Sequence, residues 1–248
     1  MSAHSKPDLR AHLAKFMRGR PISKEAQQAF LDLDAKRQEV GMYQDFVREG
    51  EPTERCCFVE SGLISRYKTW RTGGRQIISF HLRGDLIDLS SSLIKIQDHG
   101  IRTHTPSVLF TVTCNDILRL TADYPELGRA FWFDTLVDAA IFQKWTLNVG
   151  RRTARERVAH LLLEFAYRFE AIGQSDGREF ILPITQADLA DAVGLSPVHI
   201  NRSLQWLRSQ RLIRTFSKTV IIEDMEALVA MADFRSAYLH PEGPRELT

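Results

Sequence analysis

The spacing of apolar residues along the chain changes from helical to strand-like and then back. Residues 8–18 and 23–33 show the three-to-four-residue spacing of amphipathic helices. From about residue 40 to residue 120, apolar positions fall in short runs separated by glycines, at roughly the 8–12-residue spacing typical of antiparallel sandwiches and barrels. Residues 108–112 and 117–120 are predicted to be its last strands. The pattern predicts a closed β-roll (a jelly-roll, or double-stranded β-helix), which can enclose a small ligand or be purely structural.

The segment from Pro125 to Val149 is a long predicted helix, limited by its initial proline and by Gly150. Its apolar side chains cover more than half of the circumference, so the helix is expected to be buried on two faces. One face would pack on its own domain and the other on a second subunit; burial of both within one domain is the alternative. The predicted homodimer contacts are Phe131, Leu136, Phe142 and Trp145.

Residues 184–207 contain two short helical patterns that follow each other directly. In the first, Leu189 and Val193 lie four residues apart and share a face. The second has a buried stripe at i, i+4 and i+7, formed by Ile200, Leu204 and Leu207. A hinge is predicted just upstream at residues 150–152, followed by an amphipathic helix over residues 154–169.

Each of these two short helices has its own start signal. Thr185 with Asp188 three residues later has the spacing of a capping box. Gly194 stands where a helix ends in a left-handed residue. Ser196 is a second N-cap, and Pro197 occupies the first helical position, where its missing N–H is no loss. These signals together predict a helix-turn-helix.

The exposed face of the second helix carries side chains that can recognise bases. At about 100° per residue, Val198, Arg202 and Gln205 point away from the buried stripe. Arginine matches the two acceptors of guanine in the major groove, glutamine and asparagine can bridge adenine, and valine can touch a thymine methyl. Flanking positions on this helix are His199, Asn201, Trp206 and Arg208.

A hairpin over residues 212–222, turning near Ser217 and Lys218, is predicted to be the wing of a winged helix. From Ala192 to Ile222 there is no Asp or Glu, and this segment carries several arginines and a lysine. Such a local field attracts phosphates although the whole chain has a formal net charge of only +2. An ordinary helical hairpin with a solvated basic face is the plain alternative, and a winged helix that binds protein is another.

Composition narrows the remaining possibilities for this 248-residue chain. Cys56, Cys57 and Cys114 form no disulfide framework, so we expect small buried side chains in a reducing cytoplasm, with redox sensing as an alternative. No segment is apolar enough to span a membrane, and the N-terminus lacks the apolar core of a signal peptide. Histidines 81, 99 and 104 lack metal-ligand spacing, so we expect neither a metal nor a cofactor, and no enzyme constellation is present.

With these features in place, the sequence resembles the Crp/Fnr family of bacterial transcription regulators along nearly its whole length. The matching features are Gly50, Gly62 and Gly84-Asp85 in the β-roll, residues 124–127, residues 157–159, and residues 184–202. The resemblance implies an α+β protein with a β-roll sensor, a dimerising helix and a winged helix that binds a palindromic operator. It also implies that Thr185 and Gln186 contact phosphates and that Arg202 reads guanine.

Two departures from the family pattern alter these expectations. Val198 stands where the family usually has a glutamate, so the operator should differ from the usual half-site. Cyclic-nucleotide binders resemble Gly-Asp-x-x-Gly-Glu followed by an Arg-Ser/Thr pair, whereas this chain has Asp88 and Leu89 at the last two motif positions. The expected effector pocket comprises Gly84, Asp85, Asp88, Asp98 and Arg102, and we expect it not to accept cyclic AMP because its carboxylates would repel the phosphate.

We therefore expect a cytoplasmic transcriptional regulator that binds double-stranded DNA as a homodimer. RNA polymerase is an expected partner, and the effector is unknown or absent. The expected domains are residues 1–122 (sensor), 123–150 (dimerisation helix) and 151–248 (winged helix). The alternative is a ligand-gated β-roll signalling module whose winged helix contacts protein. The full set of expected DNA contacts is Thr185, Gln186, Ser196, Pro197, Val198, His199, Asn201, Arg202, Gln205, Arg208 and Lys218.

Overall fold

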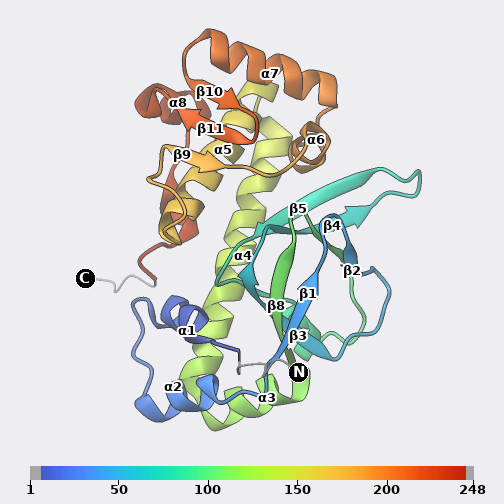
Figure 1. Cartoon of the computed structure of the whole chain (residues 1–248), viewed down its shortest axis with the longest axis vertical. Coiled ribbons are helices and arrows are strands. Elements are labelled where there is room, and N and C mark those ends of the chain that lie inside the picture. Colours follow the sequence, from blue (N-terminus) through green and yellow to red (C-terminus); the bar gives the residue numbers. More distant parts are fainter. Residues whose placement is uncertain (1–6, 244–248) are drawn as a thin grey trace, which may run out of the picture. The chain divides into compact units, whose positions relative to one another are not determined.

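A computed structural model describes residues 7–243, so the expected domain ends at residues 1–6 and 244–248 lie outside the described part (Figure 1). The chain forms two compact units. Within the described part, the first comprises residues 7–66, 80–138 and 240–243, and the second comprises residues 67–79 and 139–239. This division differs from the expected boundaries in two ways. It divides the long helix between residues 138 and 139, and it assigns residues 67–79 to the unit with the helix-turn-helix.

The predicted β-roll is confirmed as two antiparallel four-stranded sheets. One sheet has the strand order β1-β8-β3-β6 and the other β2-β7-β4-β5. Cross-strand pairs such as Phe58 with Phe110 set the register of β3 on β8. The strands are β1 (Lys36–Val40), β2 (Asp45–Val47), β3 (Arg55–Ser61), β4 (Ile64–Thr69), β5 (Arg75–His81), β6 (Leu86–Ile87), β7 (Gly100–Thr103) and β8 (Ser107–Thr113).

The predicted strand over residues 117–120 is wrong, because this segment lies in helix α3 (Cys114–Asp123). The Thr113 hydroxyl accepts a hydrogen bond from the Asp116 N–H and so caps the helix. Ile117 and Leu120 are three residues apart and both are buried, which is helical spacing. A run of only four residues was too short to distinguish the two periods.

Aromatic rings fill the core of the first unit and fix its helices. The Phe16 ring of α1 (Arg10–Met17) lies 5.0 Å from that of Phe131 on α4 (Pro125–Arg151). The Phe30 ring of α2 (Lys24–Leu31) lies 5.6 Å from that of Phe58. All four side chains are at most 2% exposed. Edge-on contacts of this kind add to the stabilisation from apolar burial.

Helix α4 continues through Gly150, so the prediction that this glycine ends the helix is wrong.

The second unit contains the winged helix. Its three-stranded sheet has the order β10-β11-β9, and α5 packs against α7 and α8. The predicted wing hairpin is confirmed as β10 and β11. The elements are α5 (Ala154–Ala171), β9 (Glu179–Ile181), α6 (Gln186–Val193), α7 (Pro197–Ser209), β10 (Ile213–Phe216), β11 (Thr219–Ile222), α8 (Met225–Ala232) and η2 (Ser236–Leu239).

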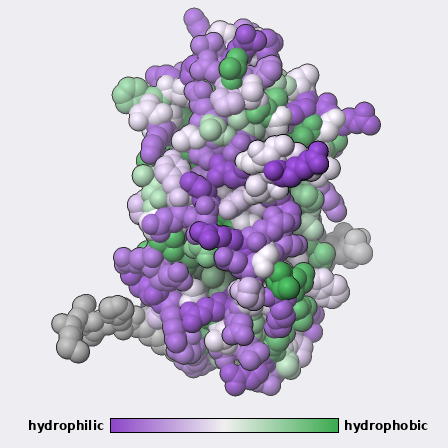
Figure 2. Space-filling model, turned by 90° about the vertical axis from the view of Figure 1, so that its right-hand side faces the viewer, coloured by the Kyte–Doolittle hydropathy of each residue, from purple (hydrophilic) through white to green (hydrophobic). Residues whose placement is uncertain are grey.

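No helix of the described part is long and apolar enough to cross a membrane. On the face drawn in Figure 2, hydrophobic residues occur singly or in small groups among hydrophilic ones. Isolated apolar residues of this kind are normal on the surface of a globular protein.

His160 is a buried polar group in the core of the second unit. It is 0% exposed, its ring stacks on Tyr238, and neither ring nitrogen has a hydrogen-bond partner among the described residues. Burial, together with the charges of Arg152 and Lys144, lowers its pKa to about 3. In the unfolded chain His160 binds a proton near pH 6.5, whereas in the folded chain it stays neutral down to about pH 3. The folded state therefore loses stability as the pH falls from about 6.5 toward 3.

Replacing His160 with Phe should therefore remove part of the acid sensitivity of the protein. Relative to wild type, the His160→Phe variant should gain about 2–3 kcal/mol in unfolding free energy between pH 6.5 and pH 4.5. Urea unfolding at several pH values measures this difference. The exposed His199→Gln variant is the control and should follow the wild-type curve. Parallel curves for wild type and His160→Phe would contradict the prediction.

Candidate DNA-binding face and sensor cavity

Local hydrogen bonds fix the start of α6. The Thr185 hydroxyl accepts from the Asp188 N–H at 3.1 Å, and the Asp188 carboxylate accepts from the Thr185 N–H at 3.0 Å. This is the predicted capping box, now confirmed. Gly194 ends the helix at φ 64° in the left-handed region. A Cβ at this position would also lie 3.2 Å from the Val149 side chain, so close packing adds to the backbone requirement for glycine.

Helix α7 buries one face and exposes the other, as its spacing predicts. Ser196 caps it by accepting from the His199 N–H, and Pro197 is its first residue. Ile200, Leu204 and Leu207 are buried. Val198 is 60% exposed although it is apolar. The expected DNA contacts Thr185, Gln186, Ser196, Pro197, Val198, His199, Arg202, Gln205, Arg208 and Lys218 are exposed, and Asn201 is half-buried.

Two side-chain contacts hold α7 in place within its unit. The Arg155 guanidinium lies 4.2 Å from the centre of the Trp206 ring, a cation–π contact that uses Trp206 structurally. Arg208 donates to the Thr215 hydroxyl at 2.8 Å and so connects α7 to the wing strand β10. At the tip of the wing, Ser217 has φ 53° and Phe216 is 79% exposed. No motif in the sequence points to Arg155, Thr215 or Phe216. The roles of Arg155 and Thr215 depend on contacts between separate elements.

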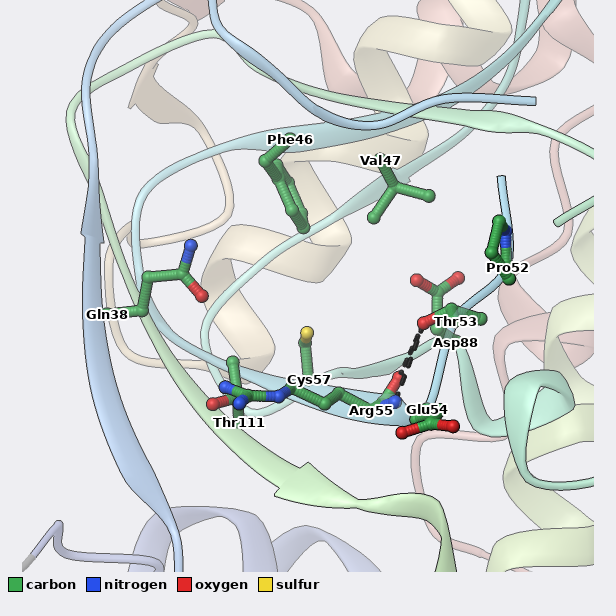
Figure 3. A pocket seen from close by; sticks show the side chains of 10 residues that line it. All are labelled: Gln38, Phe46, Val47, Pro52, Thr53, Glu54, Arg55, Cys57, Asp88 and Thr111. Atoms are coloured by element: carbon green, nitrogen blue, oxygen red, sulfur yellow. Dashed lines mark hydrogen bonds between the residues drawn. The ribbon is translucent and has the colours of Figure 1, made fainter. Parts of the chain in front are cut away.

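A cavity of about 440 Å³ lies among strands of the β-roll (Figure 3). Figure 3 shows the Phe46 ring and the Cys57 sulfur facing the same open space, with the Asp88 carboxylate at its side. Cys57 and Thr111 are direct cross-strand partners, so they share one face of the sheet. The lining consists of Gln38, Phe46, Val47, Pro52, Thr53, Glu54, Arg55, Cys57, Asp88 and Thr111.

Of the five expected pocket residues, Asp88 lines this cavity, and Gly84, Asp85, Asp98 and Arg102 do not. Lys15 of α1 lies 3.1 Å from a carboxylate oxygen of Asp85. Arg102 pairs instead with Asp45 at 3.1 Å. These side chains reach partners on other elements, which a motif comparison along one segment could not reveal.

Asp88 adopts an unusual backbone conformation for a residue with a side chain. Its φ is 63°, in the left-handed region that favours glycine. Asp88 occupies the position of the second glycine in the Gly-Asp-x-x-Gly-Glu motif of cyclic-nucleotide binders. The side chain is 1% exposed, and one of its oxygens lies 3.0 Å from His99 Nε2. His99 therefore provides the partner that a buried carboxylate requires. Asp98, also beside His99, is mostly exposed.

The three cysteines are buried. Burial raises the pKa of the Cys56 and Cys57 thiols far above their usual value. The Cys56 and Cys114 sulfurs are 4.0 Å apart. Because the thiolate is the reactive form, this environment favours the expectation of small buried side chains over that of redox sensors.

Two of the four expected dimer residues lie inside their own chain. Phe131 is 2% exposed and Trp145 is 6% exposed, with the Trp145 indole N–H donating to Glu164 at 2.9 Å. The prediction that these two residues contact a second subunit is corrected: they pack inside their own chain. When both faces of a helix are apolar, its sequence does not show which face packs on its own domain. Leu136 and Phe142 are about half exposed. Exposed large apolar residues of α4 are Trp132, Leu136, Phe142 and Leu147.

Two family models match this chain. A Crp-like helix-turn-helix domain matches residues 156–231, and a cyclic nucleotide-binding domain matches residues 40–124. The nitrogen fixation regulation protein FixK of Azorhizobium caulinodans is 29% identical over 187 residues, covering 73% of this chain and 72% of the relative. The anaerobic regulatory protein of Pasteurella multocida is 26% identical over 189 residues, covering 76% of this chain and 69% of the relative.

A solved structure supports the fold. FixK2 from Bradyrhizobium japonicum superposes with a TM-score of 0.74 at 24% identity, covering 80% of this chain and 98% of that structure. The two family models together span more than half of the sequence, in the order sensor-like domain and then helix-turn-helix. With the capped helix-turn-helix and the two-sheet β-roll, these matches place the chain in the Crp/Fnr family of transcriptional regulators.

Proposed function

We propose that this protein binds a palindromic DNA operator as a homodimer and reads it with α7. The observation that carries the proposal is the exposed face of α7, where Arg202 and Gln205 project beside Val198. Arginine and glutamine are the side chains that contact guanine and adenine through paired hydrogen bonds. Thr185 and Gln186, exposed at the start of α6, would position the helix by contacting phosphates.

Charge supports DNA as the partner of this face. The segment from Ala192 to Ile222 carries arginines and Lys218 but no carboxylate. Phosphate contacts release counterions, so binding should weaken steeply as salt is raised. A winged helix that binds protein is the competing function, and binding to duplex DNA that is weak and insensitive to salt would favour it.

The proposed dimer forms along the exposed stripe of α4. The exposed apolar residues Trp132, Leu136, Ala139 and Leu147 lie within a narrow sector of the helix at 100° per residue. Exposed positions on this helix follow three-and-four-residue steps, the spacing of a coiled-coil seam. A two-fold dimer would present two copies of α7 to half-sites about one helical turn apart, roughly 34 Å.

The effector is proposed not to be a cyclic nucleotide. A phosphodiester in a β-roll needs a cation and hydrogen-bond donors around its charge. Among the ten lining residues of the cavity, Arg55 is the one cation, whereas Glu54 and Asp88 are two carboxylates. Leu89 replaces the glutamate of the family motif. We infer that the dimer binds DNA without a cyclic nucleotide, or with a less anionic small molecule in the cavity.

Arg202→Ala should reduce both affinity and base discrimination. We expect a loss of about 1–3 kcal/mol at the preferred operator and relaxed selectivity at one base position. Lys218→Ala, on the wing, should weaken specific and random duplexes alike. Binding of an operator library before and after each substitution measures the two effects. An equal loss on specific and random DNA for Arg202→Ala would refute its role as a base reader.

Charged substitutions on the α4 stripe should disrupt the dimer. Leu136→Asp places two charges near the two-fold axis, so the variant should sediment as a monomer or aggregate and lose operator binding. Leu93→Asp, at an exposed position in the loop after η1 (Leu89–Ser92), is the matched control and should leave both unchanged. A monomeric wild type at micromolar concentration that binds a palindrome with full affinity would contradict the dimer.

Cyclic AMP and cyclic GMP should neither bind nor change operator affinity. The carboxylate of Asp88 in the cavity disfavours a second negative charge nearby. Calorimetry with each nucleotide, together with operator titrations in its presence and absence, measures this. An Asp88→Gly variant restores the family residue and is the matched comparison. Saturable micromolar binding to wild type that tightens the operator complex would show the prediction to be wrong.

A further inference from the structure

The hairpin between β4 and β5 contacts the first helix of the helix-turn-helix. Residues 67–79 of this hairpin belong to the same compact unit as α6 and α7. Arg75, at the start of β5, lies 2.7 Å from Asp188 and 2.8 Å from Asp191, both on α6. One guanidinium thus bridges two carboxylates on adjacent turns, an arrangement suited to its planar fork of donors.

Asp188 takes part in two interactions at once. One of its oxygens accepts from the Thr185 N–H in the capping box, and the other accepts from Arg75. The residue is only 4% exposed. A buried carboxylate without a cation is costly, so the capping box and the Arg75 ion pair support each other.

Gln76, the next residue of the hairpin, contacts the C-terminal end of α6. The Gln76 amide donates to the Ala192 carbonyl at 3.1 Å. Ala192 lies in the last turn of α6, where carbonyls have no partner within the helix. Arg75 and Gln76 therefore contact α6 near its start and near its end, and these two points fix the direction of the helix.

These contacts leave the proposed DNA-binding surface accessible. Thr185 and Gln186 remain exposed at the start of α6, as do Val198 and Arg202 on α7. Asp188 and Asp191 are negative charges one and two turns from the proposed phosphate contacts. The single positive charge of Arg75 offsets one of these two negative charges and so reduces their repulsion of a phosphate backbone.

We propose that Arg75 is a positioning residue for DNA binding: it fixes the direction of α6, and with it α7, and halves the negative charge that Asp188 and Asp191 place on α6. This inference rests on the proposed DNA-binding function. It assigns a part of the DNA-binding machinery to a hairpin some 110 residues upstream in sequence, since Arg75 and Asp188 are 113 residues apart.

The test compares Arg75→Ala, Arg75→Lys and Asp191→Asn with the control Arg71→Ala. Arg71 is on the same hairpin, and its guanidinium lies 5.9 Å from the Trp70 ring. The probes are the duplex that the wild-type protein enriches from a random library and a random duplex of equal length. Arg75→Ala should weaken binding to the enriched duplex roughly five- to fifty-fold, within the usual range of coupling between sites. Arg71→Ala should remain within twofold of wild type.

Charge reversal separates positioning from simple loss of stability. Arg75→Asp should weaken binding, and adding Asp191→Arg to it should recover part of the loss, because the ion pair is restored with opposite polarity. The effect of Arg75→Ala should also be smaller in the Asp191→Asn background. Equal effects in both backgrounds, or wild-type affinity for Arg75→Ala, would overturn the proposal. Where Arg75→Ala does not fold, Arg75→Lys and Asp191→Asn provide the same comparison.

Amide hydrogen exchange tests the contact independently of DNA. Arg75→Ala should exchange faster than wild type in α6, while α8 keeps its protection. If the wild-type protein enriches no duplex, the proposed function fails, and exchange alone then decides on Arg75. Unchanged protection of α6 in Arg75→Ala would overturn its positioning role.

Discussion

The burial of Ile200, Leu204 and Leu207 of α7 constrains the rest of the DNA-binding unit. Helix α7 packs on α5, and because a helix turns by about 100° per residue, this burial forces Val198, Arg202 and Gln205 outward. The caps at Thr185 and Ser196 fix where the helices α6 and α7 begin. The identity of the exposed side chains can therefore vary without changing the fold, which is how one scaffold can read different operators.

Buried charges are paired in both units. In the first, Lys15 lies between Asp85 and Asp134, at 3.1 Å and 2.7 Å. In the second, Arg75 bridges Asp188 and Asp191. Removing the shared cation of such a set leaves two carboxylates uncompensated, so each cation favours the arrangement of elements that it joins. Asp85, one of the partners of Lys15, is not among the residues that line the cavity.

The cavity combines the family fold with a lining residue that departs from the family motif. Strands of both sheets border a space of about 440 Å³. At its side, Asp88 occupies a left-handed backbone position suited to glycine and is paired with His99. In the proposed function, a buried carboxylate of this kind disfavours an anionic ligand without any change in the strands that form the walls.

The sequence by itself determined the helix-turn-helix, its caps and its exposed face, because these depend on contacts between residues at most four positions apart. It also determined the β-roll through the spacing of short apolar runs. Only the tertiary structure decided that Phe131 and Trp145 are internal and that residues 117–120 are helical. It alone brought Arg55 to the cavity and Arg75 to α6, because such pairings join residues distant in sequence, and neither helical nor strand periodicity encodes them.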